Sequence, residues 1–267
     1  MSKFNSLNEN GHLIIKNFLK KSEKKIINKA FFEVLSKYLK LEKKNSKLNF
    51  NNYKVHKEMI NFRKKNPKGF ADFYDELNLN SSLKSIFFSK KFIKLFAKIL
   101  KTKKEFVYIN GFMLRLDAPY DKRNSVDWHT DSFFFEQTRP NYNAGVCWLA
   151  LTTNNDKNGS VKFISSSHKS QPEKLDKLKF RRKNKFSTYT ARLSISKKEK
   201  KLLKTTNTSF GDAGIFDINL KHRSGKNTSK KIRISFLCRF HDASNKFNIG
   251  KEAYVYNKTN RITLKYK

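Results

Sequence analysis

In the first hundred residues, apolar side chains recur at the three- and four-residue spacing of helices. Ser22 is the expected N-cap of one helix, and a second helical stretch runs from about Ser82 to Leu100. The apolar face of the first helix is expected to comprise Ile26, Ile27, Ala30, Phe31, Val34, Leu35 and Tyr38. Residues 43–54 are polar and predict a loop, and the short apolar run from His12 to Ile15 predicts an edge strand.

From residue 105 the pattern changes to short runs rich in Val, Ile, Phe and Tyr, which are typical of strands. The runs are 106–116, 144–152, 160–165, 214–218 and 232–240. Turn signals such as Asn158-Gly159 and Gly211-Asp212 separate them. Many short strands punctuated in this way favour a sandwich or barrel over alternating strand-helix units. Residues 171–209 form a basic insertion, in which we expect a strand near 188–195 and a helix through 197–203.

The length of the chain favours one substantial core. We therefore predict a single domain over residues 1–267, with a mainly helical part at 1–104 and a β core at 105–267. No apolar run approaches the roughly 20 residues that cross a bilayer, and the N-terminus lacks a cleavage pattern. Cys147 and Cys238 lie in apolar runs and are expected to be reduced core residues. These features predict a cytoplasmic protein and leave its oligomeric state open.

The chain is strongly basic, with 59 Lys and Arg against 22 Asp and Glu and a formal net charge of +37. Such a surface attracts anions, including nucleic acid and phosphorylated compounds. The lysines are nevertheless spread through almost every segment and accompany many Asn, Ile and Phe residues. This distribution favours a compositional bias over a dedicated binding face, so charge alone identifies no partner.

The sharpest local motif is Trp128-His129-Thr130-Asp131. On an extended backbone, residues two apart point to the same side, so His129 and Asp131 can offer a nitrogen and an oxygen to one metal. His222 follows a predicted strand and precedes a polar turn, which would place it at the rim of a barrel. Two histidines and one carboxylate are the ligand set of non-haem iron oxygenases, whereas zinc sites more often recruit cysteine. We therefore expect these three residues to be catalytic metal ligands.

Arg233 lies eleven residues after His222 on the next strand-like run. Its planar fork suits the distant carboxylate of 2-oxoglutarate, and Ser235, on the same strand face, can add a hydroxyl donor. The partner of a buried arginine can equally be an internal Asp or Glu. Arg115 is a further candidate for contact with 2-oxoglutarate or an anionic substrate, with a salt bridge to Asp117 as the alternative. Trp148 is assigned to the core.

These residues occur within a longer ordered pattern that resembles the phytanoyl-CoA dioxygenase-like family of iron(II)- and 2-oxoglutarate-dependent oxygenases. The pieces that carry the resemblance are the opening segment 11–19, the metal motif 128–131, the stretch 158–169, the segment 211–216, His222, the triplet 227–229 and the triplet 233–235. Ser165-Ser166 departs from the Pro-Gly that the family commonly has there, and residues 171–209 align with nothing in it.

The resemblance implies an α+β fold, with a double-stranded β-helix (jelly-roll) core flanked by N-terminal helices. It implies that His129, Asp131 and His222 bind Fe(II), and that Arg233 binds the 2-oxoglutarate cosubstrate, with O₂ as the oxidant. Related halogenases carry a small residue in place of the carboxylate, so Asp131 favours hydroxylation, with release of succinate and CO2. A small molecule is the expected substrate, with anionic and CoA-linked compounds among the candidates.

Two other functions stay open at the level of sequence. An oxygenase acting on nucleic acid would use the positive charge and needs a continuous basic groove that leads to the metal. A jelly-roll binding protein without catalysis would need no complete ligand set, so the presence of all three ligands with Arg233 argues against it.

Overall fold

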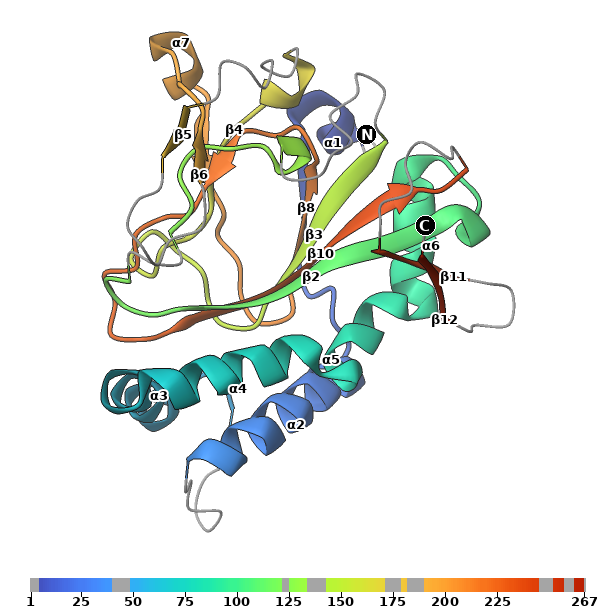
Figure 1. Ribbon diagram of the computed structural model, residues 1–267. Helices are drawn as coiled ribbons and strands as arrows, with labels where there is room; N and C mark the ends of the chain where they lie inside the picture. Colours follow the sequence, from blue (N-terminus) through green and yellow to red (C-terminus); the bar gives the residue numbers. More distant parts are fainter. Residues whose placement is uncertain are drawn as a thin grey trace.

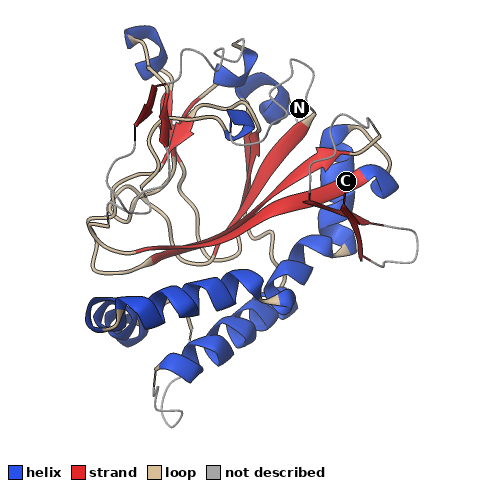
Figure 2. Cartoon of the chain, viewed as in Figure 1, coloured by secondary structure: helices blue, strands red, loops and turns tan. Residues whose placement is uncertain are grey.

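The computed structural model describes residues 5–39, 49–121, 125–133, 143–170, 179–181, 190–244, 252–256 and 262–266. The predicted loop at 43–54 falls partly outside these residues. Figure 1 shows a layer of helices packed beneath a long twisted sheet, with a smaller group of strands above it. Figure 2 shows that the helices lie mainly on one side of this sheet.

The first part of the chain forms several helical segments, most of which build this layer. They are α1 (Asn5–Asn10), α2 (Lys21–Tyr38), α3 (Tyr53–Lys65), α4 (Pro67–Leu79), α5 (Ser81–Ser85), η1 (Ile86–Phe88), α6 (Lys90–Leu100) and η2 (Lys104–Phe106). Of these, α1 lies near the top of Figure 1. Asparagine side chains cap three consecutive helices by accepting a backbone N–H: Asn52 for α3, Asn66 for α4 and Asn80 for α5.

Three details of the predicted helices are wrong. The first helix begins at Lys21, so Ser22 lies inside it rather than capping it, and the Lys20 N–H donates to the Glu23 carboxylate instead. Ile26 is 46% exposed, because its neighbour Ile27 faces the core and adjacent helical residues point roughly 100° apart. The stretch 82–100 is interrupted at Ser89, which adopts the extended conformation of an N-cap and starts α6.

The large sheet has the order β1-β8-β3-β10-β2-β11-β12, and every pairing in it is antiparallel. Its strands are β1 (His12–Ile15), β2 (Val107–Asp117), β3 (Ala144–Ala150), β8 (Ala213–Asp217), β10 (Arg233–Asp242), β11 (Glu252–Tyr256) and β12 (Ile262–Tyr266). The predicted edge strand and the strand-like runs that correspond to β2, β3, β8 and β10 are confirmed, with small shifts at their ends.

A second sheet, of order β7-β4-β9, comprises β4 (Lys162–Ile164), β7 (Leu203–Thr205) and β9 (His222–Arg223). The remaining short elements are η3 (Asp131–Phe133), η4 (Ser167–Lys169), β5 (Lys179–Arg181), β6 (Thr190–Arg192) and α7 (Lys197–Lys200). The strand and helix expected within the insertion are therefore present in shorter form as β6 and α7. We continue to propose that residues 1–267 form a single domain.

The alternation of side chains along β3 explains how the layers are joined. Cys147 and Leu149 belong to the large apolar core between the sheet and the helices. Val146, Trp148 and Ala150 point to the opposite face, where they pack with Phe163 of the second sheet and other apolar residues. Because both faces are covered, every residue of β3 is buried. The predicted jelly-roll core with flanking N-terminal helices is confirmed.

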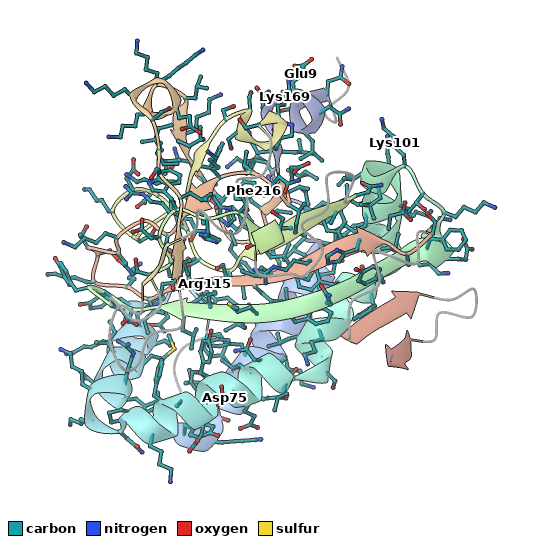
Figure 3. All side chains as sticks on the ribbon, turned by 45° about the horizontal axis from the view of Figure 1, so that its top comes forward. Glu9, Asp75, Lys101, Arg115, Lys169 and Phe216 are labelled. Atoms are coloured by element: carbon teal, nitrogen blue, oxygen red, sulfur yellow. The ribbon has the colours of Figure 1, made fainter. Side chains whose placement is uncertain are left out.

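Both cysteines are free and buried, as expected, and they lie directly opposite each other on β3 and β10. The charged side chains of Lys101, Lys169 and Glu9 project outward in Figure 3, whereas Phe216 and Arg115 lie in the interior.

Candidate active site

His129 and His222 are brought together by a small backbone ladder. The His129 N–H donates to the His222 carbonyl at 2.9 Å, and the reverse bond has the same length. This isolated bridge places the ring centroids 4.2 Å apart. Asp131, two residues further on, begins η3 and is buried beside them. One nitrogen from each histidine and one Asp131 oxygen all lie within 4.8 Å of one another.

The hydrogen bonds made by the two Nδ1 atoms turn the Nε2 atoms of both imidazoles toward Asp131. Nδ1 of His129 lies 2.6 Å from the Asp127 carbonyl, and Nδ1 of His222 lies 2.8 Å from the Leu220 carbonyl. Since a carbonyl only accepts, each Nδ1 carries the proton. The two Nε2 atoms lie 3.6 and 3.9 Å from Oδ1 of Asp131. Lone pairs that converge in this way, with second hydrogen bonds fixing each ring, fit a metal ion.

Electrostatics keeps these groups in the protonation states that a metal needs. Burial, together with the nearby charge of His129, lowers the pKa of His222 to about 4, so the ring is neutral at pH 7. Burial acts to raise the pKa of Asp131, but the Arg239 guanidinium and the His129 hydrogen bond outweigh it and hold that pKa far below its usual range. Asp131 is thus an ionised carboxylate, and the His222 imidazole beside it is neutral at pH 7.

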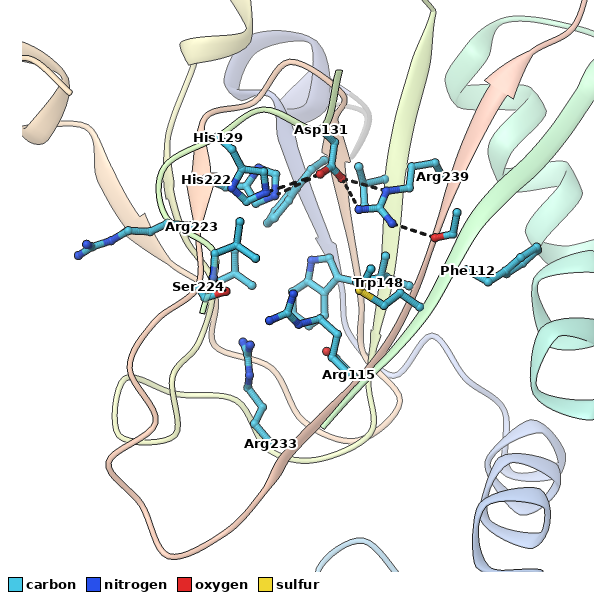
Figure 4. Close-up of a pocket in the computed structure, with 18 residues that line it drawn as sticks. Phe112, Arg115, His129, Asp131, Trp148, His222, Arg223, Ser224, Arg233 and Arg239 are labelled. Carbon is cyan, nitrogen blue, oxygen red and sulfur yellow. Dashed lines mark hydrogen bonds and ion pairs between the residues drawn. The ribbon is translucent and has the colours of Figure 1, made fainter. Parts of the chain in front are cut away.

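Arg239 is a site residue that the sequence interpretation missed. Its Nε donates to Oδ2 of Asp131 at 3.1 Å, and a terminal nitrogen lies 3.1 Å from the same oxygen (Figure 4). Its other terminal nitrogen donates to the Gly111 carbonyl at 2.8 Å. The available signal was the period of two along β10, because Arg233, Ser235 and Arg239 all line the same cavity.

Both alternatives left open for Arg115 and Arg233 involve Asp117, and the structure contains both salt bridges. Arg115 donates to Oδ1 of Asp117 at 2.9 Å, and Nε of Arg233 donates to Oδ2 at 3.1 Å. Burial acts to raise the pKa of Asp117, but the two guanidiniums outweigh it and lower that pKa to about 2. Arg115 and Arg233 nevertheless line the cavity as well, below the histidines in Figure 4. The salt bridges therefore place both cations at the cavity wall.

The helical layer holds the backbone beside both of these arginines. The Asn78 side chain of α4 accepts from the Leu114 N–H at 2.7 Å and donates to its carbonyl at 3.3 Å. The buried His56 of α3 accepts from the Ile232 N–H at 3.2 Å. Leu114 and Ile232 directly precede Arg115 and Arg233 in the chain. The N-terminal helices thus position the strand segments from which the two guanidiniums enter the cavity.

The cavity has a volume of about 420 Å³, which lies within the range of small-molecule sites. Its polar lining includes the three candidate ligands, Ser224, Ser235 and four arginines, and its apolar lining includes Met113, Val126, Val146, Val161, Phe216 and Leu237. Trp148 belongs to the smaller core cluster, as expected, and it also lines this cavity. The buried Nε1 of this indole has no hydrogen-bond partner among the described residues.

A jelly-roll core with two histidines and a carboxylate at the mouth of a cavity defines the class of non-haem iron, 2-oxoglutarate-dependent oxygenases. A family profile described as "Phytanoyl-CoA dioxygenase (PhyH)" matches residues 7–235. The chain belongs to this family, as its sequence pattern predicted, and it is an oxygenase.

Solved structures share the fold at low sequence identity. EctD from S. alaskensis, described "with 2-oxoglutarate and 5-hydroxyectoine", superposes with a TM-score of 0.58 at 16% identity, over 93% of this chain and 77% of that one. The epimerase SnoN has a TM-score of 0.58 at 13% identity, over 95% and 84%. The non-haem monooxygenase ThoJ has a TM-score of 0.57 at 16% identity, over 90% and 77%.

A search of curated protein sequences finds no match. Among the described residues, no helix combines the length and apolar character that a membrane span requires.

Proposed function

We propose that this protein hydroxylates a small molecule, using Fe(II), 2-oxoglutarate and O2 and releasing succinate and CO2. The observation that carries the proposal is the convergence of His129 Nε2, His222 Nε2 and Asp131 Oδ1 at one end of the cavity. In this proposal the three side chains hold the iron on one face. The iron, when bound, supplies the oxidising chemistry, and the protein supplies ligand geometry and substrate orientation.

Arg233 is proposed to bind the far carboxylate of 2-oxoglutarate. Its Nε and one terminal nitrogen are engaged by Asp117, which fixes the plane of the guanidinium and leaves donors for a second carboxylate. Ser235, two residues along the same strand face, can add a hydroxyl donor, and Arg115 shares Asp117 with Arg233. EctD has the same fold and its structure is described with 2-oxoglutarate, which supports this assignment.

Trp148 is proposed to donate its indole N–H to the cosubstrate or to the substrate. A buried donor without a partner costs roughly 1–3 kcal/mol, and a ligand that accepts from this N–H would offset that cost. The apolar wall beside it, which includes Val146 and Phe216, excludes water from the reacting part of the cavity. Asp131 fills the carboxylate position that related halogenases leave to a halide, which favours hydroxylation.

The substrate is proposed to be an anionic or CoA-linked small molecule. Four arginines line the cavity, and among the described lining residues the only carboxylate is that of Asp131. A substrate with a carboxylate or phosphate suits such a lining. Because the cavity holds about 420 Å³, a CoA-linked substrate would enter by its acyl end, with the nucleotide outside. We also keep the prediction that the protein is cytoplasmic.

The test is iron-dependent formation of succinate from 2-oxoglutarate by the purified protein. Turnover should require Fe(II), rise when a carboxylated or phosphorylated substrate is supplied, and disappear in His129→Ala. His168→Ala is the matched control, because this histidine bonds the Asn8 carbonyl of α1 outside the cavity. Succinate formation that persists in His129→Ala would refute the metal assignment. Binding of 2-oxoglutarate without any turnover would instead indicate a binding protein.

A further inference from the structure

We infer that Arg239 is a positioning residue that holds Asp131 so that only one of its carboxylate oxygens, Oδ1, is offered to the metal. The inference deepens the proposed function and rests on it. It concerns how many coordination positions of the metal the protein would fill. The identity of the three ligands does not determine this number, because a carboxylate can bind through one oxygen or two.

The two oxygens of Asp131 have different surroundings. Oδ1 faces the histidines, at 3.6 Å from His129 Nε2 and 3.9 Å from His222 Nε2. Oδ2 faces the opposite way, where two nitrogens of Arg239 lie 3.1 Å from it. Figure 4 shows the carboxylate between the imidazoles and the guanidinium. A charge-assisted contact through two nitrogens to a buried carboxylate strongly restricts rotation of that group.

A distortion of the neighbouring strand holds Arg239 in place. Leu237 of β10 pairs with Met113 of β2, whereas Arg239 pairs with Asn110, so β2 carries an extra residue between these pairs. Gly111 has a φ of 57° at this bulge, a conformation that favours glycine. Its carbonyl accepts from Arg239 at 2.8 Å. The bulge therefore supplies an anchor for one terminal nitrogen, while Nε and the other terminal nitrogen face Asp131.

The consequence is a reserved coordination position. A six-coordinate metal held by two imidazoles and one carboxylate oxygen would keep three positions open, enough for a chelating 2-oxo acid and O2. If Oδ2 were released, the carboxylate could chelate the metal and occupy one of these three. Arg239 also places a positive charge beside the metal, so its role is not to strengthen metal binding.

The experiment uses Mn(II) as the probe and counts the water molecules that it retains when bound, by the relaxation of solvent protons per bound ion. Arg239→Met removes the guanidinium donors to Oδ2 while keeping an extended side chain. Arg233→Met is the matched control, because it removes a buried arginine from the same strand and cavity whose partner is Asp117 rather than Asp131. Both variants are measured without 2-oxoglutarate, so that any effect on cosubstrate binding does not enter.

In Arg239→Met the proton relaxation per bound Mn(II) is expected to fall by about one third, as three open positions become two, with Mn(II) affinity equal to or higher than that of the wild type. Arg233→Met should keep the wild-type relaxation. If Arg239→Met does not fold, Arg239→Gln carries the same measurement and the same expected decrease.

Unchanged proton relaxation per bound Mn(II) in the Arg239 variant would overturn the inference. If the affinity for Mn(II) also fell about tenfold or more, Arg239 would have a structural role alone. Failure of the wild-type protein to bind Mn(II), or binding that survives His129→Ala, would instead refute the proposed metal site itself.

Discussion

Arg233 and Asp117 lie directly opposite each other on the antiparallel strands β10 and β2, and Nε of Arg233 donates to Oδ2 of Asp117 at 3.1 Å. Both side chains are nearly inaccessible to solvent. Asp117 also accepts from Arg115, so one carboxylate orients two cations at the cavity wall. The pairing fixes where an incoming carboxylate meets a positive charge.

Arg233→Met is expected to raise the Kd for 2-oxoglutarate about 10- to 100-fold, because a hydrogen bond to a charged group contributes roughly 1.5–3 kcal/mol. Isothermal titration of the Mn(II)-loaded protein with 2-oxoglutarate checks it. Arg63→Met is the control, since Arg63 pairs with Asp121 outside the cavity. An unchanged Kd in Arg233→Met would remove Arg233 from the cosubstrate site.

Asp117→Asn should destabilise the fold by about 3–5 kcal/mol at pH 7, because it leaves two buried guanidiniums without their shared carboxylate. Urea unfolding followed by fluorescence measures the loss. The destabilisation should shrink in Asp117→Asn/Arg233→Met, where one of the two cations is gone. The Arg233→Met single variant completes the cycle, and a loss in the double variant equal to the sum of the two single losses would show that the pair is not energetically coupled.

Trp148→Phe tests the indole donor. The change keeps an aromatic ring against Phe216 and removes only Nε1–H and part of the ring area. If the N–H bonds a ligand, KM for the cosubstrate or the substrate should rise about 3- to 10-fold, in line with a net hydrogen-bond contribution of roughly 0.5–1.5 kcal/mol. Steady-state kinetics with each compound varied separately identifies which one is bound. If KM is unchanged for both the cosubstrate and the substrate, Trp148 contributes only to packing.

The buried His241 is expected to make the free energy of unfolding depend on pH. It is fully buried, its ring stacks on Tyr108, and its Nε2 donates to Asn110 Oδ1 at 2.9 Å. Burial, reinforced by the charge of Arg239, lowers the pKa of His241 to about 3. Because the unfolded chain takes up this proton near pH 6.5 and the folded chain does not, stability falls as the pH drops below 6.5.

Between pH 6.5 and pH 5 this one group accounts for about 2 kcal/mol of lost stability. His241→Gln should therefore lose less stability than the wild type over that interval, as measured by urea unfolding at several pH values. Tyr108→Phe, which keeps the stacked ring, should retain the wild-type slope. The same slope in His241→Gln would contradict a neutral buried imidazole.

Much of this protein can be inferred from short-range pattern. The side of each helix or strand that is buried determines where its apolar residues fall. The helical spacing before residue 100 and the strand-like runs after residue 105 can therefore be recognised from the sequence. His129 and Asp131 are two residues apart, so their common face also follows from local geometry. His222 and Arg233 are inferred from the strand-like runs before and after a polar turn, and the ordered family pattern supports both.

Other features depend on partners that are distant in the chain. Arg239 becomes part of the site only because the bulge at Gly111, 128 residues away, anchors its guanidinium beside Asp131. Trp148 packs in the smaller core cluster and also lines the cavity, because the second sheet covers that side of β3. Strand periodicity indicates that two residues share a face, but not what stands opposite that face.

The sequence by itself determined the class of fold, the three candidate metal ligands and the arginine suited to a carboxylate, because spacing and residue chemistry carry that information. Tertiary structure alone decided that Asp117 orients two arginines and that Arg239 takes one oxygen of Asp131. Those relationships depend on register, on a single extra residue in β2 and on burial, which strengthens each charge pair by removing water from it.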